Sequence, residues 1–193
     1  MTTPVPTATE PPAHNGLMYT PDRRPNHCAY CGTRFDDTTS WPRDCPGCGE
    51  TTWANPLPVA VTLLPVTGGD DSTNLLVVRR SIEPGAGLPA LPGGYIELGE
   101  TWQEAAAREL DEESRIIADP ADIELFQVDH SQRTIQVFGL LPRRHVTELP
   151  ESTPTPEAHG WHLITGPTEL AFPTHTRTVE KFFNAQGSSN DGG

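Results

Sequence analysis

The sequence is poor in positive charge and lacks long apolar runs. It carries 13 lysines and arginines against 26 aspartates and glutamates, which gives a net charge of −13. Such a chain is poorly suited to wrapping nucleic acid, because phosphate contacts need basic side chains. A polyanionic substrate would need cations at its binding site. No stretch approaches the roughly 20 apolar residues of a membrane-spanning helix, so we expect no membrane partner.

Both ends of the chain contain few bulky apolar residues. Residues 1–25 are rich in proline and threonine, without the apolar centre of a secretory signal, and residues 186–193 read QGSSNDGG. Segments of this composition bury too little surface to fold. We therefore predict a disordered arm over 1–25, a disordered tail over 186–193 and a cytoplasmic location. The sequence leaves open whether the chain forms a homodimer.

Four cysteines form two Cys-x2-Cys pairs, with residues 32–44 between the pairs. This spacing is typical of a zinc ribbon, in which four thiolates converge tetrahedrally on one ion. Disulfides are the alternative, and they fit poorly with a cytoplasmic chain. A four-cysteine site has no open coordination position, so its role would be structural. The sequence predicts a zinc ribbon over 26–54 that binds Zn²⁺ through Cys28, Cys31, Cys45 and Cys48.

From residue 56 onward the pattern becomes strand-like. Apolar runs bounded by turn residues predict strands at 58–66, 74–80, 123–130, 133–141 and 160–164. One convincing helix follows residue 100, and a short helix is expected over 176–183. This order of elements favours an α+β domain over 55–185, with a mixed β-sheet covered by helices.

The central helix begins with a capping box from Thr101 to Glu104, so Trp102 is expected as its first residue. On a helical wheel its apolar stripe consists of Trp102, Ala106, Leu110 and Ile117. The opposite, solvated face includes Glu104, Arg108, Asp111 and Arg115.

Glu109, Glu112 and Glu113 do not join that solvated face. They fall at or inside the edge of the apolar stripe, and at helical spacing Arg108 reaches only Glu112. Three carboxylates pressed against a core repel one another, and divalent cations would relieve that repulsion. Oxygen ligands suit Mg²⁺ or Mn²⁺. An ordinary charged helix surface is the alternative interpretation.

The same segment matches the Nudix box, G-x5-E-x7-R-E-U-x-E-E-x-G-U, where U is a bulky aliphatic residue. The matching positions are Gly94, Glu100, Arg108, Glu109, Leu110, Glu112, Glu113 and Ile116. The chain thus resembles the Nudix hydrolases, which fold as an α/β/α sandwich. The resemblance implies Mg²⁺-dependent hydrolysis of a diphosphate bond in a nucleotide-linked small molecule, such as ADP-ribose, NADH or a nucleoside triphosphate.

The resemblance also implies roles for individual residues. Glu109, Glu112 and Glu113 would bind Mg²⁺ or Mn²⁺, together with a backbone carbonyl at Gly93. Glu109 would also help to deprotonate the attacking water. Arg108 would orient Glu109, and Glu100 would support the site. A zinc ribbon ahead of the domain resembles the NADH pyrophosphatases, but their SQPWPFP array is missing, which weakens a specificity for NAD(H).

One position departs from the box, because Arg115 stands where the family has glycine. No helix breaker precedes Asp119 and Pro120, so we expect the helix to continue toward Ala118. Arg115 would then face solvent, away from the glutamates.

Some side chains admit two interpretations. Arg79 and Arg80 could reach substrate phosphates or be merely solvated. Glu157 could add a metal ligand or a base. Three aromatic residues could stack on a base or pack in the core, namely Phe126, Phe138 and Trp161.

The whole chain also admits a second function. A non-catalytic Nudix module would sense a nucleotide, and its ribbon would bind a partner. The presence of every box glutamate favours the enzyme. Nucleic-acid binding by the ribbon rests on a weak basic patch of four arginines, namely Arg23, Arg24, Arg34 and Arg43.

Overall fold

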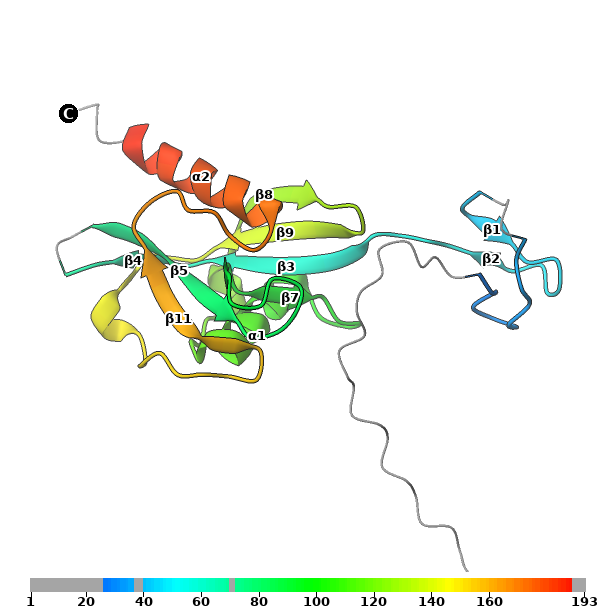
Figure 1. The fold of residues 1–193 in the computed structure, drawn as a ribbon, viewed down its shortest axis with the longest axis horizontal. Coiled ribbons are helices and arrows are strands. Elements are labelled where there is room, and N and C mark those ends of the chain that lie inside the picture. Colours follow the sequence, from blue (N-terminus) through cyan, green and yellow to red (C-terminus); the bar gives the residue numbers. More distant parts are fainter. Residues whose placement is uncertain (1–25, 37–39, 70–71, 189–193) are drawn as a thin grey trace, which may run out of the picture.

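The computed structural model describes residues 26–36, 40–69 and 72–188 (Figure 1). The predicted arm over 1–25 and positions 189–193 of the predicted tail lie outside this part of the chain. In chain order the elements are β1 (Arg43–Asp44), β2 (Thr51–Thr52), β3 (Leu57–Leu63), β4 (Pro65–Thr67), β5 (Thr73–Arg80), β6 (Pro89–Ala90), β7 (Gly93–Tyr95), α1 (Trp102–Ser114), β8 (Glu124–His130), β9 (Thr134–Leu140), β10 (Arg144–His145), β11 (Ala158–Ile164) and α2 (Pro173–Ser188), with 3-10 turns at Pro120–Asp122 and Val146–Glu148.

The strands of the main domain form two mixed sheets. One has the order β7-β3-β9-β8, with β3 and β9 parallel, and the other has the order β10-β4-β5-β11, with β6 pairing β5. The single strand expected over 58–66 is in fact two, because the chain passes from one sheet to the other at Leu64. Leu141 donates to the carbonyl of Leu63, whereas Leu76 donates to that of Leu64.

Side chains alternate between two cores along these strands, as strand geometry requires. Ala60 and Leu76 belong to a cluster that includes Ala105, Ala106 and Leu110 of α1. The adjacent strand positions belong to a second cluster, which includes the α2 residues Val179 and Phe182. The helices therefore lie on opposite faces of the sheets, as Figure 1 shows. The domain is an α+β fold of the expected α/β/α type.

Helix α1 begins as the sequence predicts. Thr101 accepts a hydrogen bond from the backbone of Glu104, and the Glu104 side chain accepts one from the Thr101 backbone, so the capping box is complete. Trp102 packs against the first core cluster, and Ala106 and Leu110 belong to it. The predicted stripe is thus confirmed as far as Leu110.

The end of α1 differs from the prediction. The helix stops at Ser114, and Arg115 adopts a left-handed conformation with φ 61°. Its amide still donates to the carbonyl of Asp111, after which the chain turns away. The prediction of a longer helix was wrong because the left-handed turn buries Ile116, which is 1% exposed, in the core. Ile117, predicted to be buried, is 77% exposed.

The cysteine-containing segment has a small core of its own. Strands β1 and β2 pair antiparallel, and Cys28, Phe35 and Cys45 are the buried apolar residues of that core. The guanidinium of Arg43 lies over the rings of Trp41 and Phe35. Figure 1 shows this module apart from the main domain, ahead of β3.

The last helix is longer than expected. It begins at Pro173 rather than near Thr176, and it ends at Ser188, three residues into the predicted tail. Within the described ranges, no helix is both long and apolar enough to span a membrane.

Replacing Arg115 with glycine should stabilise the protein. A left-handed L-residue costs about 1–2 kcal/mol, and glycine largely avoids this cost. We expect Arg115→Gly to melt about 2–5 °C higher in calorimetry. The matched control is Arg115→Ala, which removes the same charge but keeps Cβ and should show no comparable gain. Equal melting temperatures for the two variants would contradict the left-handed cap.

Candidate functional site

Arg108 of α1 links three of the predicted carboxylates. Its Nη1 lies 2.7 Å from Glu109 and 3.3 Å from Glu112. Its Nε and Nη2 donate to Glu100 at 3.2 and 2.9 Å, and Nη2 also donates to the Tyr95 carbonyl at 3.0 Å. The i,i+4 contact with Glu112 is the one that helical spacing predicts, and Arg108 also binds Glu109 and Glu100, which helical spacing does not bring to it. A guanidinium with five donors in a planar fork can hold several acceptors in fixed positions.

Glu113 and Glu109 are the buried members of the cluster, 3% and 8% exposed. Burial raises the pKa of Glu113 to about 8, although the Gly93 amide, 3.1 Å away, donates to its carboxylate and opposes the shift. Burial also raises the pKa of Glu109, against the opposing effect of its hydrogen bond to Arg108. The metal-free site therefore favours a protonated Glu113 at neutral pH.

Two glycines of β7 allow close approaches, one to a carboxylate of α1 and one to β3. A Cβ on Gly94 would lie 2.2 Å from Oε1 of Glu109, and a Cβ on Gly93 would lie 2.4 Å from the Ala60 carbonyl of β3. Strand β7 therefore sits against both β3 and the glutamates, as the glycines allow. The proposed metal contact of the Gly93 carbonyl remains a prediction, whereas its amide already binds Glu113.

Two further residues lie at the same site, namely Glu157, for which the sequence left a role as ligand or base open, and Arg115. A pocket of about 180 Å³ is lined by Glu112, Glu113, Arg115, Pro156 and Glu157. The charge of Glu157 contributes to the raised pKa of both Glu109 and Glu113. The prediction that Arg115 lies away from the glutamates was wrong, because the left-handed turn brings it to this pocket.

The carboxylates offer a donor set suited to hard divalent cations. In the structure they are occupied by protein donors, since Arg108 binds Glu109 and Glu112 while Gly93 binds Glu113. Among the described residues, only the cysteines form a group of three or more candidate ligands with all ligand atoms within 4.8 Å of one another. The glutamates would have to exchange these protein contacts for metal contacts when cations bind.

The four cysteines converge at the distances of a tetrahedral site. Sγ of Cys28 lies 3.7 Å from that of Cys48, and Sγ of Cys31 lies 3.5 Å from that of Cys45. Four Zn–S bonds of about 2.3 Å would place sulfurs roughly 3.8 Å apart. The Gly47 amide donates to Cys45, which is the kind of hydrogen bond that supports a thiolate ligand. The donor set therefore fits zinc.

The residues with two interpretations mostly serve the fold. Arg79 donates to the Gly87 carbonyl and Arg80 to that of Pro84, so both hold the loop after β5. The aromatic residues pack in the cores: Phe138 is fully buried, Phe126 lies against Phe182, and Trp161 packs on the α1 side.

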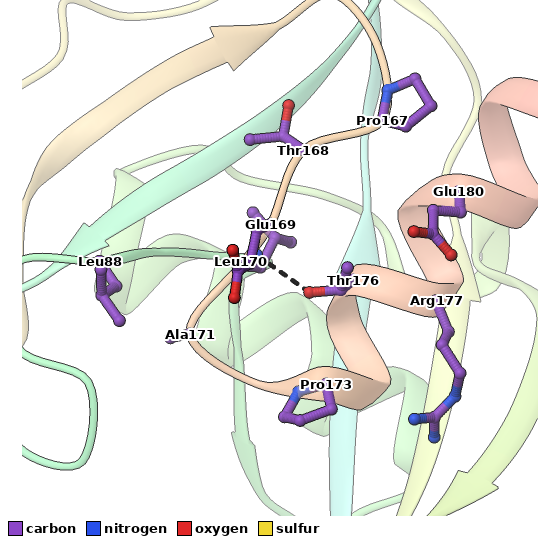
Figure 2. Close-up of a pocket in the computed structure, with 10 residues that line it drawn as sticks. All are labelled: Leu88, Pro167, Thr168, Glu169, Leu170, Ala171, Pro173, Thr176, Arg177 and Glu180. Carbon is purple, nitrogen blue, oxygen red and sulfur yellow. Dashed lines mark hydrogen bonds between the residues drawn. The ribbon is translucent and has the colours of Figure 1, made fainter.

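A larger hollow, of about 600 Å³, borders α2 and the segment before it (Figure 2). Its lining residues are Leu88, Pro167, Thr168, Glu169, Leu170, Ala171, Pro173, Thr176, Arg177 and Glu180. It shares no residue with the carboxylate pocket. Arg177 is bound to Asp129 at 2.7 Å, and Leu170 donates to Thr176 at 3.0 Å. This hollow therefore adds nothing to the carboxylate chemistry.

The raised pKa of Glu113 should appear as pH-dependent stability. An ordinary pKa of 4.5 in the unfolded chain and about 8 in the folded one means that the folded state binds more protons between these values. The free energy of unfolding should fall as pH rises through this range. Glu113→Gln removes the penalty, so its advantage over the wild type should grow from about pH 5 to pH 8, by on the order of a few kcal/mol.

Denaturant unfolding in the presence of a chelator measures this advantage. Glu112→Gln is the control, because that side chain is 58% exposed and carries little desolvation penalty. An advantage of Glu113→Gln that stays constant across the pH range would contradict the burial argument.

Comparison with known proteins agrees with this geometry. A model of the NUDIX domain matches residues 56–184. The ADP-ribose pyrophosphatase of Methanocaldococcus jannaschii is 42% identical over 48 residues, which cover 25% of this chain and 28% of that protein. The NAD-capped RNA hydrolase NudC of Shigella flexneri is 30% identical over 95 residues, which cover 49% of this chain and 35% of that protein. The matches thus span only about a third of these relatives.

The fold has solved counterparts as well. The crystal structure of a NUDIX hydrolase from Nitrosomonas europaea superposes with a TM-score of 0.60 at 22% identity, covering 84% of this chain and 93% of that one. This likeness shows the shared fold. Since the NUDIX model covers residues 56–184, which is more than half of the chain, the chain belongs to the Nudix family.

Proposed function

We propose that the chain is a divalent-metal-dependent pyrophosphohydrolase that cleaves the diphosphate bond of a nucleoside diphosphate-linked substrate. The observation that carries this proposal is the placement of Glu112, Glu113 and Glu157 around one pocket, with Glu109 held beside it by Arg108. Structural packing alone gives no reason to bury carboxylates beside one another, because each loses hydration and repels the next. Metal-assisted phosphoryl chemistry gives such a reason, because it requires several carboxylates close together.

The residues divide the work as follows. Glu109, Glu112 and Glu113 would hold Mg²⁺ or Mn²⁺, with the Gly93 carbonyl as a further ligand. A divalent cation held there would supply positive charge that neutralises the diphosphate oxygens and stabilises the leaving phosphate. Arg108 fixes the orientation of Glu109, and Glu100 holds the other edge of the Arg108 fork. Glu109, whose raised pKa suits proton transfer, accepts the proton of the attacking water, with Glu157 as a second candidate base.

The substrate is a small molecule with a nucleoside diphosphate, and ADP-ribose is the first candidate. Its support is the activity named for the archaeal relative, an ADP-ribose pyrophosphatase. The experiment is a panel of ADP-ribose, NADH, diadenosine polyphosphates and nucleoside triphosphates, with AMP and phosphate release measured. Metal-dependent release of AMP from ADP-ribose supports the proposal. No release from any member would overturn it in favour of a nucleotide-sensing module.

We also propose that Cys28, Cys31, Cys45 and Cys48 bind one structural Zn²⁺ in a ribbon over 26–54, ahead of a catalytic domain over 55–185. Support comes from the sulfur distances and from the small size of the core around Cys28, Phe35 and Cys45. A module with so few buried apolar residues needs a metal to stay folded.

Glu112→Gln and Glu113→Gln should each lower turnover by at least ~100-fold at saturating Mg²⁺, because each removes a charged metal ligand. Asp111→Asn is the matched control on the same helix. It lies outside the pocket and should keep the wild-type rate. Steady-state kinetics on the best substrate of the panel make the comparison. Near-normal turnover in either glutamine variant would remove that residue from the metal site.

Cys45→Ser should lose the zinc without unfolding the catalytic domain. The two main cores share no residue with the ribbon core, so the main thermal transition should be retained. Zinc analysis and far-UV circular dichroism measure both effects, and chelator-treated wild type provides the control. Loss of all regular secondary structure in the variant would show that the ribbon is part of the main fold.

A further inference from the structure

Arg115 is the one non-glycine residue with a positive φ in the part of the chain that the structure describes. Its conformation is one that glycine adopts without strain and that other L-residues adopt at a cost. Strained residues persist where the surrounding structure holds them, and they cluster at functional sites. The turn alone would favour glycine at this position. The presence of an arginine there therefore requires a further explanation.

The side chain stands at the carboxylate pocket. Arg115 lines it together with Glu112, Glu113 and Glu157, so a permanent positive charge borders three acidic residues. Across the described ranges, no ion pair within 4.0 Å joins Arg115 to a carboxylate. By contrast, Arg108 of α1 forms ion pairs with three carboxylates, those of Glu100, Glu109 and Glu112. The Arg115 guanidinium is thus available to an anion that enters the pocket.

The chemistry of the pocket selects the anion. A guanidinium binds phosphate through two parallel N–H donors, and the neighbouring carboxylates would repel an anion that arrives without cations. A diphosphate neutralised by divalent cations meets both conditions.

We propose that Arg115 is a substrate-binding residue whose guanidinium binds a non-bridging oxygen of the substrate's diphosphate at the rim of this pocket. The inference rests on the proposed function. It assigns Arg115 to substrate affinity and leaves the carboxylates their role in turnover. An arginine in this left-handed turn makes the fold less stable than glycine would, but it provides a phosphate contact that glycine cannot make.

Equilibrium binding tests the contact without turnover. The probe is α,β-methylene-ADP, whose P–C–P bridge resists hydrolysis, titrated by calorimetry in the presence of Mg²⁺. Arg115→Gln should raise Kd about tenfold, a change that corresponds to about 1.4 kcal/mol. Arg115→Lys should restore part of the affinity because it keeps the charge but loses the planar fork. The exposed Arg143 provides the control, and Arg143→Gln should bind as the wild type does.

Two further readouts separate binding from a structural role. Arg115→Gly should weaken binding as much as Arg115→Gln does, yet melt at a higher temperature. The Kd of the wild type should also rise more steeply with salt than that of Arg115→Gln, because an ionic contact is screened.

Unchanged Kd in Arg115→Gln, with the wild type binding the probe, would overturn this inference and leave the proposed function intact. Failure of the wild type both to bind the probe and to hydrolyse any substrate of the panel would overturn the proposed function and the inference with it.

Discussion

The burial of carboxyl groups in the second half of α1 is the constraint on which the site depends. Glu113 and Glu109 are desolvated beside each other, and Glu112 and Glu157 add further negative charge. Each carboxylate would be costly alone. Hydrogen bonds offset part of this cost. The Gly93 amide donates to Glu113, and the Arg108 guanidinium donates to Glu109. These donors hold the carboxylates in place in the structure.

The rest of the fold provides the positions for this arrangement. The α1 face packs through small alanines, which bring the helix close to β3. Gly93 lets β7 approach β3, and Gly94 lets β7 approach Glu109 of the same helix. The backbone of Glu157 accepts a hydrogen bond from Ser81 at the end of β5, so the second sheet delivers the fourth carboxylate. Elements of both sheets therefore position the carboxylates of the site. Because the chain passes from one sheet to the other at Leu64, this passage contributes to the geometry of the site.

Local features were predictable from the sequence, whereas features decided by distant contacts were not. The start of α1, the cysteine pairs and the box glutamates follow from short spacings, so Thr101 and the cysteines were placed correctly. The end of α1 depends on the burial of Ile116 in a core built by other elements. Helix propensity is a local property, so it does not reflect these contacts. Distant contacts also decide two other features that the sequence did not predict. These are the hydrogen bond of Arg108 to the Tyr95 carbonyl and the division of residues 58–66 between two sheets.

The central claim is that Glu113 is a buried, proton-holding carboxyl that releases its proton when a divalent cation binds. Calorimetric titration of Mn²⁺ at pH 7, repeated in buffers of different ionisation enthalpy, counts the protons released on binding. The account predicts release of close to one proton per chain in the wild type and of much less in Glu113→Gln. Mn²⁺ binding to the wild type with no proton release would contradict it.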